Sequence, residues 1–115
     1  MGNYVTETLI DLGLLDKKAV QNQNPKIPLY KQYFMHSTSH FLGLDVHDVG
    51  GRYTELQAGM VLTIEPGIYI KEENLGIRLE NDFLITASGT EDLCAEIPIS
   101  PEELEGLINK TNTSN

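Results

Sequence analysis

The sequence has little that would cross-link it, bind nucleic acid or span a membrane. It contains one cysteine, no tryptophan, and 8 lysine and arginine residues against 17 aspartate and glutamate residues, which gives a formal net charge of −9. A single cysteine excludes an internal disulfide and favours a reducing compartment, so we expect a cytoplasmic protein. Nucleic acids need clusters of basic residues, and a membrane span needs about 18 consecutive apolar residues, so neither is expected as a partner.

What the sequence does contain is typical of one small globular domain. Of its 115 residues, 40% are hydrophobic and 22% are charged. These fractions lie near the averages of folded proteins, and a domain usually takes about 100 to 200 residues. We therefore expect a single domain over residues 1–115, with residues 111–115 as a frayed tail.

The N-terminal third is expected to be helical and then irregular. Apolar residues at helical spacing predict a helix over residues 4–15, with Gly13 near its end as a stop signal. Asp16 is placed to cap a short second helix. Residues 21–28 are polar and contain two prolines, which predicts a loop.

The rest of the chain is expected to form strands and a last helix. Residues 60–70 and 76–86 alternate in the manner of β-strands, and the second run places Arg78 and Glu80 opposite its apolar side chains. The sequence Ser-Pro-Glu-Glu at residues 100–103 is typical of a helix N-terminus. The order helix, loop, antiparallel strands and helix predicts an α+β fold.

Three histidines lie within twelve positions of one another: His36, His40 and His47. Such a cluster indicates a metal site, an acid–base site or a coincidence. The zinc motif HExxH is excluded, because no glutamate follows His36.

Two glutamates strengthen the interpretation as a metal site. Glu65 interrupts an apolar strand, and burying an unpaired carboxylate there would cost several kcal/mol. Glu80 follows Arg78 by two residues on the other predicted strand. A divalent ion would explain His40, Glu65 and Glu80 together, because such ions take mixed imidazole and carboxylate ligands. The alternative is a solvated face with a weak Arg78–Glu80 surface pair, and spacing alone does not separate the two.

A resemblance to a known family rests on three blocks: FMHSTSHFLGLDVHDVG at 34–50, ELQAGMVLTIEPGIYI at 55–70 and GIRLENDFLIT at 76–86. They resemble the C-terminal half of the catalytic domain of Xaa-Pro aminopeptidases, which are pita-bread metallopeptidases related to prolidase and methionine aminopeptidase. The similarity covers nearly all of residues 4–110. It implies half of a pita-bread fold, with a curved antiparallel sheet packed with helices, and hence a partial domain.

The resemblance also implies a site for two divalent metal ions. His40 and Glu65 match metal ligands, and Glu80 matches the carboxylate that bridges the two ions. Mn²⁺ is the expected metal, with Co²⁺ or Zn²⁺ as alternatives. The implied reaction is hydrolysis of the first peptide bond of substrates whose second residue is proline, by a water molecule that the ions activate.

Three further residues match supporting positions of the family. His36 and His47 match histidines that contact the substrate and manage proton and charge movement at the scissile bond. Arg78 matches a residue that orients the carboxylate ligands.

The sequence also departs from the family pattern. The family needs an upstream histidine and two aspartates eleven residues apart, and no two aspartates here have that separation. We therefore expect a fragment with an incomplete site and no activity of its own. Smaller departures are Ser37, where glycine is commoner, and Asn81, where an acidic residue usually stands.

Three other interpretations stay open. The chain could belong to a prolidase, whose blocks look similar, or it could be a non-catalytic binding module with the pita-bread shape. A further hypothesis is that two copies associate through the face that the missing half would cover.

Overall fold

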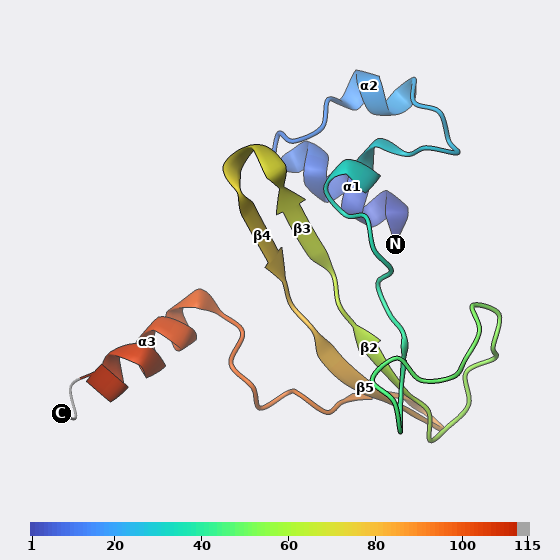
Figure 1. Ribbon diagram of the computed structural model, residues 1–115, viewed down its shortest axis with the longest axis vertical. Coiled ribbons are helices and arrows are strands. Elements are labelled where there is room, and N and C mark those ends of the chain that lie inside the picture. Colours follow the sequence, from blue (N-terminus) through green and yellow to red (C-terminus); the bar gives the residue numbers. More distant parts are fainter. Residues whose placement is uncertain (113–115) are drawn as a thin grey trace. The chain divides into compact units, whose positions relative to one another are not determined.

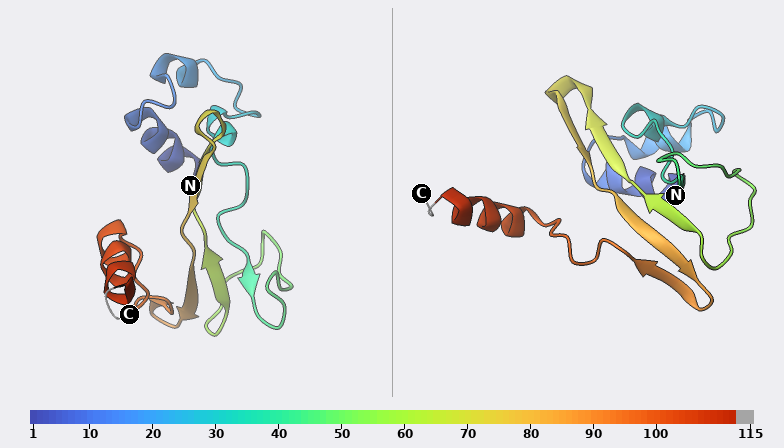
Figure 2. Two further views of the ribbon diagram at one scale, coloured as in Figure 1. Left: turned by 60° about the vertical axis from the view of Figure 1, so that its left-hand side comes forward. Right: turned by 60° about the horizontal axis from the view of Figure 1, so that its bottom comes forward.

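The computed structural model describes residues 1–112, which group into two compact units (Figures 1 and 2). The first unit combines residues 1–39 with 65–78, and the second combines residues 40–64 with those from 79 onward. Each unit contains helices and antiparallel strands, which confirms the predicted α+β class. That the chain is one partial domain remains a prediction.

The first unit is built from three helical segments and a β-hairpin. Its elements are α1 (Gly2–Asp11), α2 (Lys17–Gln21), the 3-10 helix η1 (Leu29–Gln32), β3 (Gly67–Ile70), the 3-10 helix η2 (Lys71–Glu73) and β4 (Leu75–Arg78). Its buried cluster consists of Val5 and Leu9 of α1 with Phe34. Ile68 of β3 packs against this cluster, so the hairpin is fixed to the helical part.

Gly13 explains why the first helix is shorter than predicted at its C-terminal end. The helix begins at Gly2, two residues earlier than expected, and ends at Asp11. Gly13 adopts a left-handed conformation with φ of 73°, which glycine adopts without strain. The following N–H groups of Leu14 and Leu15 then donate to the carbonyl of Leu9.

The short second helix has the cap that the sequence predicts. The Asp16 side chain accepts a hydrogen bond of 2.8 Å from the N–H of Ala19. This bond satisfies one of the free donors of the first turn of α2.

The second unit contains a four-stranded antiparallel sheet. Its strands are β1 (Phe41–Leu42), β2 (Val61–Ile64), β5 (Asn81–Thr86) and β6 (Gly89–Asp92), in the order β1-β2-β5-β6. The central pair aligns Thr63 with Asp82, and a tight connection at residues 87 and 88 leads from β5 to β6. The strand regions predicted at 60–70 and 76–86 thus each form two strands in place of one.

Helix α3 (Pro101–Asn112) follows the sheet of this unit. The Ser100 hydroxyl accepts a bond of 3.3 Å from the N–H of Glu103 and lies 2.9 Å from its carboxylate, which confirms the predicted cap. The helix continues two residues into the predicted tail, and residues 113–115 lie outside the described part of the chain. No helix among residues 1–112 is both long and apolar enough to cross a membrane.

Candidate active site

Pro66 lies where the first predicted strand region, 60–70, is interrupted. The β2–β5 pairing ends at Ile64, and the β3–β4 pairing starts at Gly67. Because proline has no N–H to donate to a ladder, Glu65 and Pro66 lie outside both pairings. The second predicted region, 76–86, is interrupted opposite this point, so that Glu80 also lies outside both pairings. Both candidate carboxylates therefore stand at the break between strands, where the backbone is not part of a sheet.

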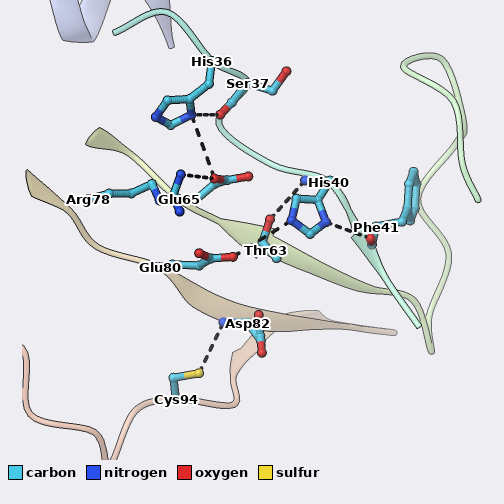
Figure 3. Close-up of polar contacts among 10 residues, drawn as sticks. All are labelled: His36, Ser37, His40, Phe41, Thr63, Glu65, Arg78, Glu80, Asp82 and Cys94. Carbon is cyan, nitrogen blue, oxygen red and sulfur yellow. Dashed lines mark hydrogen bonds and ion pairs between the residues drawn. The ribbon is translucent and has the colours of Figure 1, made fainter. Parts of the chain in front are cut away.

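Glu65 is a buried carboxylate with basic groups beside it. The residue is 9% exposed, and its Oε2 lies 3.9 Å from Nδ1 of His36 and 3.8 Å from Nη1 of Arg78 (Figure 3). Its backbone N–H donates to the carbonyl of Thr38 at 2.8 Å. Positive charge nearby offsets the cost of burying a carboxylate. Glu65, His36 and Arg78 therefore form one cluster within the first unit.

His36 is held at both ring nitrogens. Its Nδ1 lies 2.6 Å from the carbonyl oxygen of Ser37, and since a carbonyl only accepts, Nδ1 carries the proton. In the neutral ring, Nε2 accepts a hydrogen bond of 3.0 Å from the hydroxyl of Tyr69. The ring of Phe34 packs edge-on at 4.8 Å between centroids. These contacts fix both the tautomer and the orientation of His36.

Tyr69 is a site residue that our sequence analysis missed. Its ring lies over two glycines: a Cβ at Gly76 would be 2.8 Å from the ring, and a Cβ at Gly67 would be 3.0 Å from the hydroxyl. Gly76 is its direct partner across the hairpin. The signal was present, because Tyr69 and Gly67 follow Glu65 at intervals of two and so share its face of the predicted strand.

His40 presents one nitrogen to a carboxylate. Its Nδ1 donates to the carbonyl of Phe41 at 2.9 Å, so in the neutral ring the lone pair is on Nε2. That Nε2 lies 4.0 Å from Oε1 of Glu80 (Figure 3). Ligand atoms lie about 2 Å from a divalent ion, and so two ligands of one ion can be separated by up to about 4 Å. The chemistry and spacing of His40 and Glu80 therefore fit a divalent ion.

Thr63 holds the backbone of His40 in place, and sequence reasoning missed it as well. The residue is 1% exposed, and its hydroxyl accepts a hydrogen bond of 3.1 Å from the N–H of His40. The N–H of Thr63 in turn donates to the His40 carbonyl at 3.0 Å. This pair of bonds fixes residue 40 beside β2.

The third histidine also belongs to this cluster. The ring of His47 lies 4.1 Å from that of His40, with 30° between the ring planes. The second unit thus brings together His40, His47 and Glu80, and the first unit brings together His36, Glu65 and Arg78. Each of the six residues singled out from the sequence lies in one of these two clusters.

Comparison with known proteins identifies a family that matches most of the chain. The model of metallopeptidase family M24 matches residues 3–87. The Xaa-Pro aminopeptidase of Escherichia coli K12 is 42% identical over 87% of this chain and 25% of its own length. The chain therefore spans about a quarter of that relative.

Solved structures agree with the sequence comparison. Aminopeptidase P from E. coli with the inhibitor Pro-Leu superposes with a TM-score of 0.80 at 39% identity, over 98% of this chain and 29% of that one. A zinc-substituted E. coli aminopeptidase P in complex with product gives a TM-score of 0.77 at 40% identity, over 95% and 28%. The fold is thus the part of the pita-bread fold that the sequence predicted. By its sequence and its fold, the chain belongs to metallopeptidase family M24.

Proposed function

We propose that this chain forms part of the active site of a metallo-aminopeptidase that removes the N-terminal residue from peptides with proline in second position. The observation that supports it most directly is the His40–Glu80 pair. The imidazole is fixed in the tautomer that carries its lone pair on Nε2, and that atom is 4.0 Å from a carboxylate oxygen. A neutral histidine whose other nitrogen donates to a carbonyl is the usual form of a metal-binding histidine.

We propose His40, Glu65 and Glu80 as metal ligands. Two carboxylates with one imidazole suit Mn²⁺, and Co²⁺ or Zn²⁺ can occupy similar ligands. When bound, the ions would polarise the peptide carbonyl and activate a water molecule. One of the similar solved structures is a zinc-substituted aminopeptidase P, which supports a site that accepts more than one divalent ion.

The other three residues handle the substrate and the ligands in this proposal. His36 and His47 contact the peptide beside the scissile bond, and each can hold or move a proton there. His36 suits that task because its ring is already oriented by Ser37 and Tyr69. Arg78 holds the carboxylate of Glu65 in position from 3.8 Å.

The chain alone is expected to be inactive. The aspartate pair of the family has no counterpart in the 115 residues. Without these ligands the ions would be held by too few groups, and the carboxylates would repel one another. We therefore expect weak metal binding and no turnover.

Calorimetric titration of the chain with Mn²⁺ tests the ligand assignment. Glu80→Gln keeps the shape of the side chain but removes its charge, and we expect it to weaken binding about tenfold or more, as changes in the metal shell do. Glu91→Gln on β6 is the matched control, because Glu91 is exposed and belongs to neither cluster. Equal affinities for the two variants would overturn the assignment.

Peptide assays test the reaction. The 115-residue chain should not hydrolyse an Xaa-Pro-Yaa peptide with Mn²⁺, whereas a protein that combines it with the aspartate pair should. Turnover by the chain itself would refute the proposal that its metal site is incomplete. Cleavage restricted to Xaa-Pro dipeptides would identify a prolidase. Function that survived replacement of His40, Glu65 and Glu80 by alanine would favour the non-catalytic module.

Two further parts of the proposal concern the setting of the protein. We propose that copies of the chain associate, because β4 is exposed along its whole length and pairs with β3 alone among the described strands.

We also propose a cytoplasmic location from the single cysteine, which cell fractionation would test.

A further inference from the structure

The loop that follows β1 is organised by the side chain of Asp48. One carboxylate oxygen accepts a hydrogen bond of 2.9 Å from the N–H of Leu44, and the other accepts one of 2.7 Å from the N–H of Val49. The loop's N–H donors on both sides of Asp48 are thus satisfied by one side chain. A carboxylate offers these two acceptors without rotating, whereas an amide offers only one oxygen.

Packing does not hold this loop. The side chains of Leu44, Val46 and Val49 are all exposed. Burial of apolar surface therefore adds little to the stability of the loop conformation. Its shape depends on the hydrogen bonds of Asp48 and on close backbone contacts.

Two glycines make those close contacts. A Cβ at Gly43 would lie 1.8 Å from the Asp48 carboxylate, so residue 43 must lack a side chain for the carboxylate to reach Leu44. At the other end of the loop, a Cβ at Gly50 would lie 2.0 Å from the ring of Phe41. The loop is therefore packed against Asp48 at its Gly43 end and against β1 at its Gly50 end.

The same closure connects the loop to the His40 ring. The carbonyl of Phe41 accepts a hydrogen bond from the backbone N–H of Asp48 at 3.0 Å and from Nδ1 of His40 at 2.9 Å. His47 precedes Asp48 directly, and its ring lies 4.1 Å from the ring of His40. Whatever fixes residue 48 therefore also fixes the backbone position from which the His47 ring extends toward His40.

We propose that Asp48 is a positioning residue, whose carboxylate, seated against Gly43, places the His47 imidazole on His40. The role of His47 toward a substrate rests on the proposed function, but the placement itself does not. Asp48 touches no reacting group in this proposal. It acts through the loop backbone and through the neighbouring histidine.

Nuclear magnetic resonance of the metal-free chain tests the placement. An aromatic ring 4.1 Å away shifts the His40 imidazole resonances, and the His47→Ala spectrum gives their position without that ring. Above the pH range of imidazole titration, Asp48→Asn should lose most of this shift. Gly43→Ala should lose it as well, because the new methyl group displaces the carboxylate.

Matched controls lie in the same loop. Asp45→Asn removes the same charge from an exposed residue whose side chain makes no hydrogen bond within residues 1–112. Gly51→Ala adds the same methyl group where a Cβ would meet only Thr54, at an ordinary 3.5 Å. Both controls should keep the shift. A shift that survived Asp48→Asn and Gly43→Ala would overturn the proposal.

The double variant and the peptide assay separate this proposal from the proposed function. If Asp48 and Gly43 act through one contact, Asp48→Asn with Gly43→Ala should move the resonances no further than either change alone. A larger change in the double variant would mean that the two residues act separately, against the proposal. If a protein that combines this chain with the aspartate pair did not hydrolyse the peptide, the proposed function would be contradicted. The shift of the His40 resonances would still test the placement of His47.

Discussion

At the scale of single residues, two of the histidines are held by hydroxyl groups: the Tyr69 hydroxyl donates to Nε2 of His36, and the Thr63 hydroxyl accepts from the backbone N–H of His40. His36, His40 and Glu65 could be named from the blocks that contain them. Thr63 and Tyr69 were missed: their spacing places them on one side of the predicted strand, but their partners depend on which residues of distant segments face them. Spacing along the chain gives the side of a strand but not the register with its neighbour.

The hydroxyl of Tyr69 gives a prediction at this scale. Tyr69→Phe keeps the ring over Gly76 but leaves Nε2 of His36 without its donor in a partly buried place. Loss of such a bond should lower the free energy of unfolding by about 1 kcal/mol, as measured by urea denaturation. Tyr53→Phe is the matched control, since Tyr53 is 94% exposed. Equal stability of the two variants would show that the hydrogen bond contributes nothing.

At the scale of elements, helix caps were predicted correctly from local sequence, whereas the points at which strands and helices are interrupted were not. The caps at Asp16 and Ser100 were predicted because a cap needs only neighbours in sequence. The strand regions were predicted, but their division at Pro66 was not, although a proline inside a strand pattern is a reason to expect one. Helix α1 ended early because Gly13 took a left-handed conformation that its position in the pattern only suggested.

Helix α3 should respond to local changes, because its side chains from Pro101 to Lys110 are exposed. Ser100→Ala removes the cap and should cost about 1 kcal/mol of helix stability. Gly106→Ala adds a methyl group where nothing lies within 4 Å and should gain a similar amount. Carbon-13 chemical shifts of residues 102–110 would measure both changes. Shifts that stayed constant in both variants would mean that contacts other than local ones hold the helix.

At the scale of the whole molecule, the chain buries few large side chains. Among the described residues, the largest side chains that are less than 2% exposed are those of Leu9 and Thr63, and many large apolar side chains remain accessible in both units. The sequence had the composition of an ordinary domain, so composition alone did not predict this. The family resemblance did, because it implied that the chain is about half of a larger catalytic domain. Apolar surface of this extent usually marks an interaction face.

Association of copies should therefore rise with concentration and depend on β4. Ile77 of this strand is 60% exposed, and Ile77→Lys places a charge on the free edge. Light scattering should show a lower mass for this variant than for the unchanged chain at high concentration. Ile27→Lys, at a loop position that is 72% exposed, should leave the mass unchanged. A strict monomer at all concentrations would contradict the proposed association.

Two of the three histidines of the first block, His36 and His40, share one hydrogen-bonding arrangement. His36 and His40 each donate Nδ1–H to the carbonyl of the next residue, Ser37 and Phe41. Because these acceptors belong to the main chain, replacing the side chain at position 37 or 41 does not remove them. The tautomer of both rings therefore does not depend on which side chain stands at position 37 or 41. A serine at position 37 is therefore compatible with an imidazole whose Nδ1 has its acceptor.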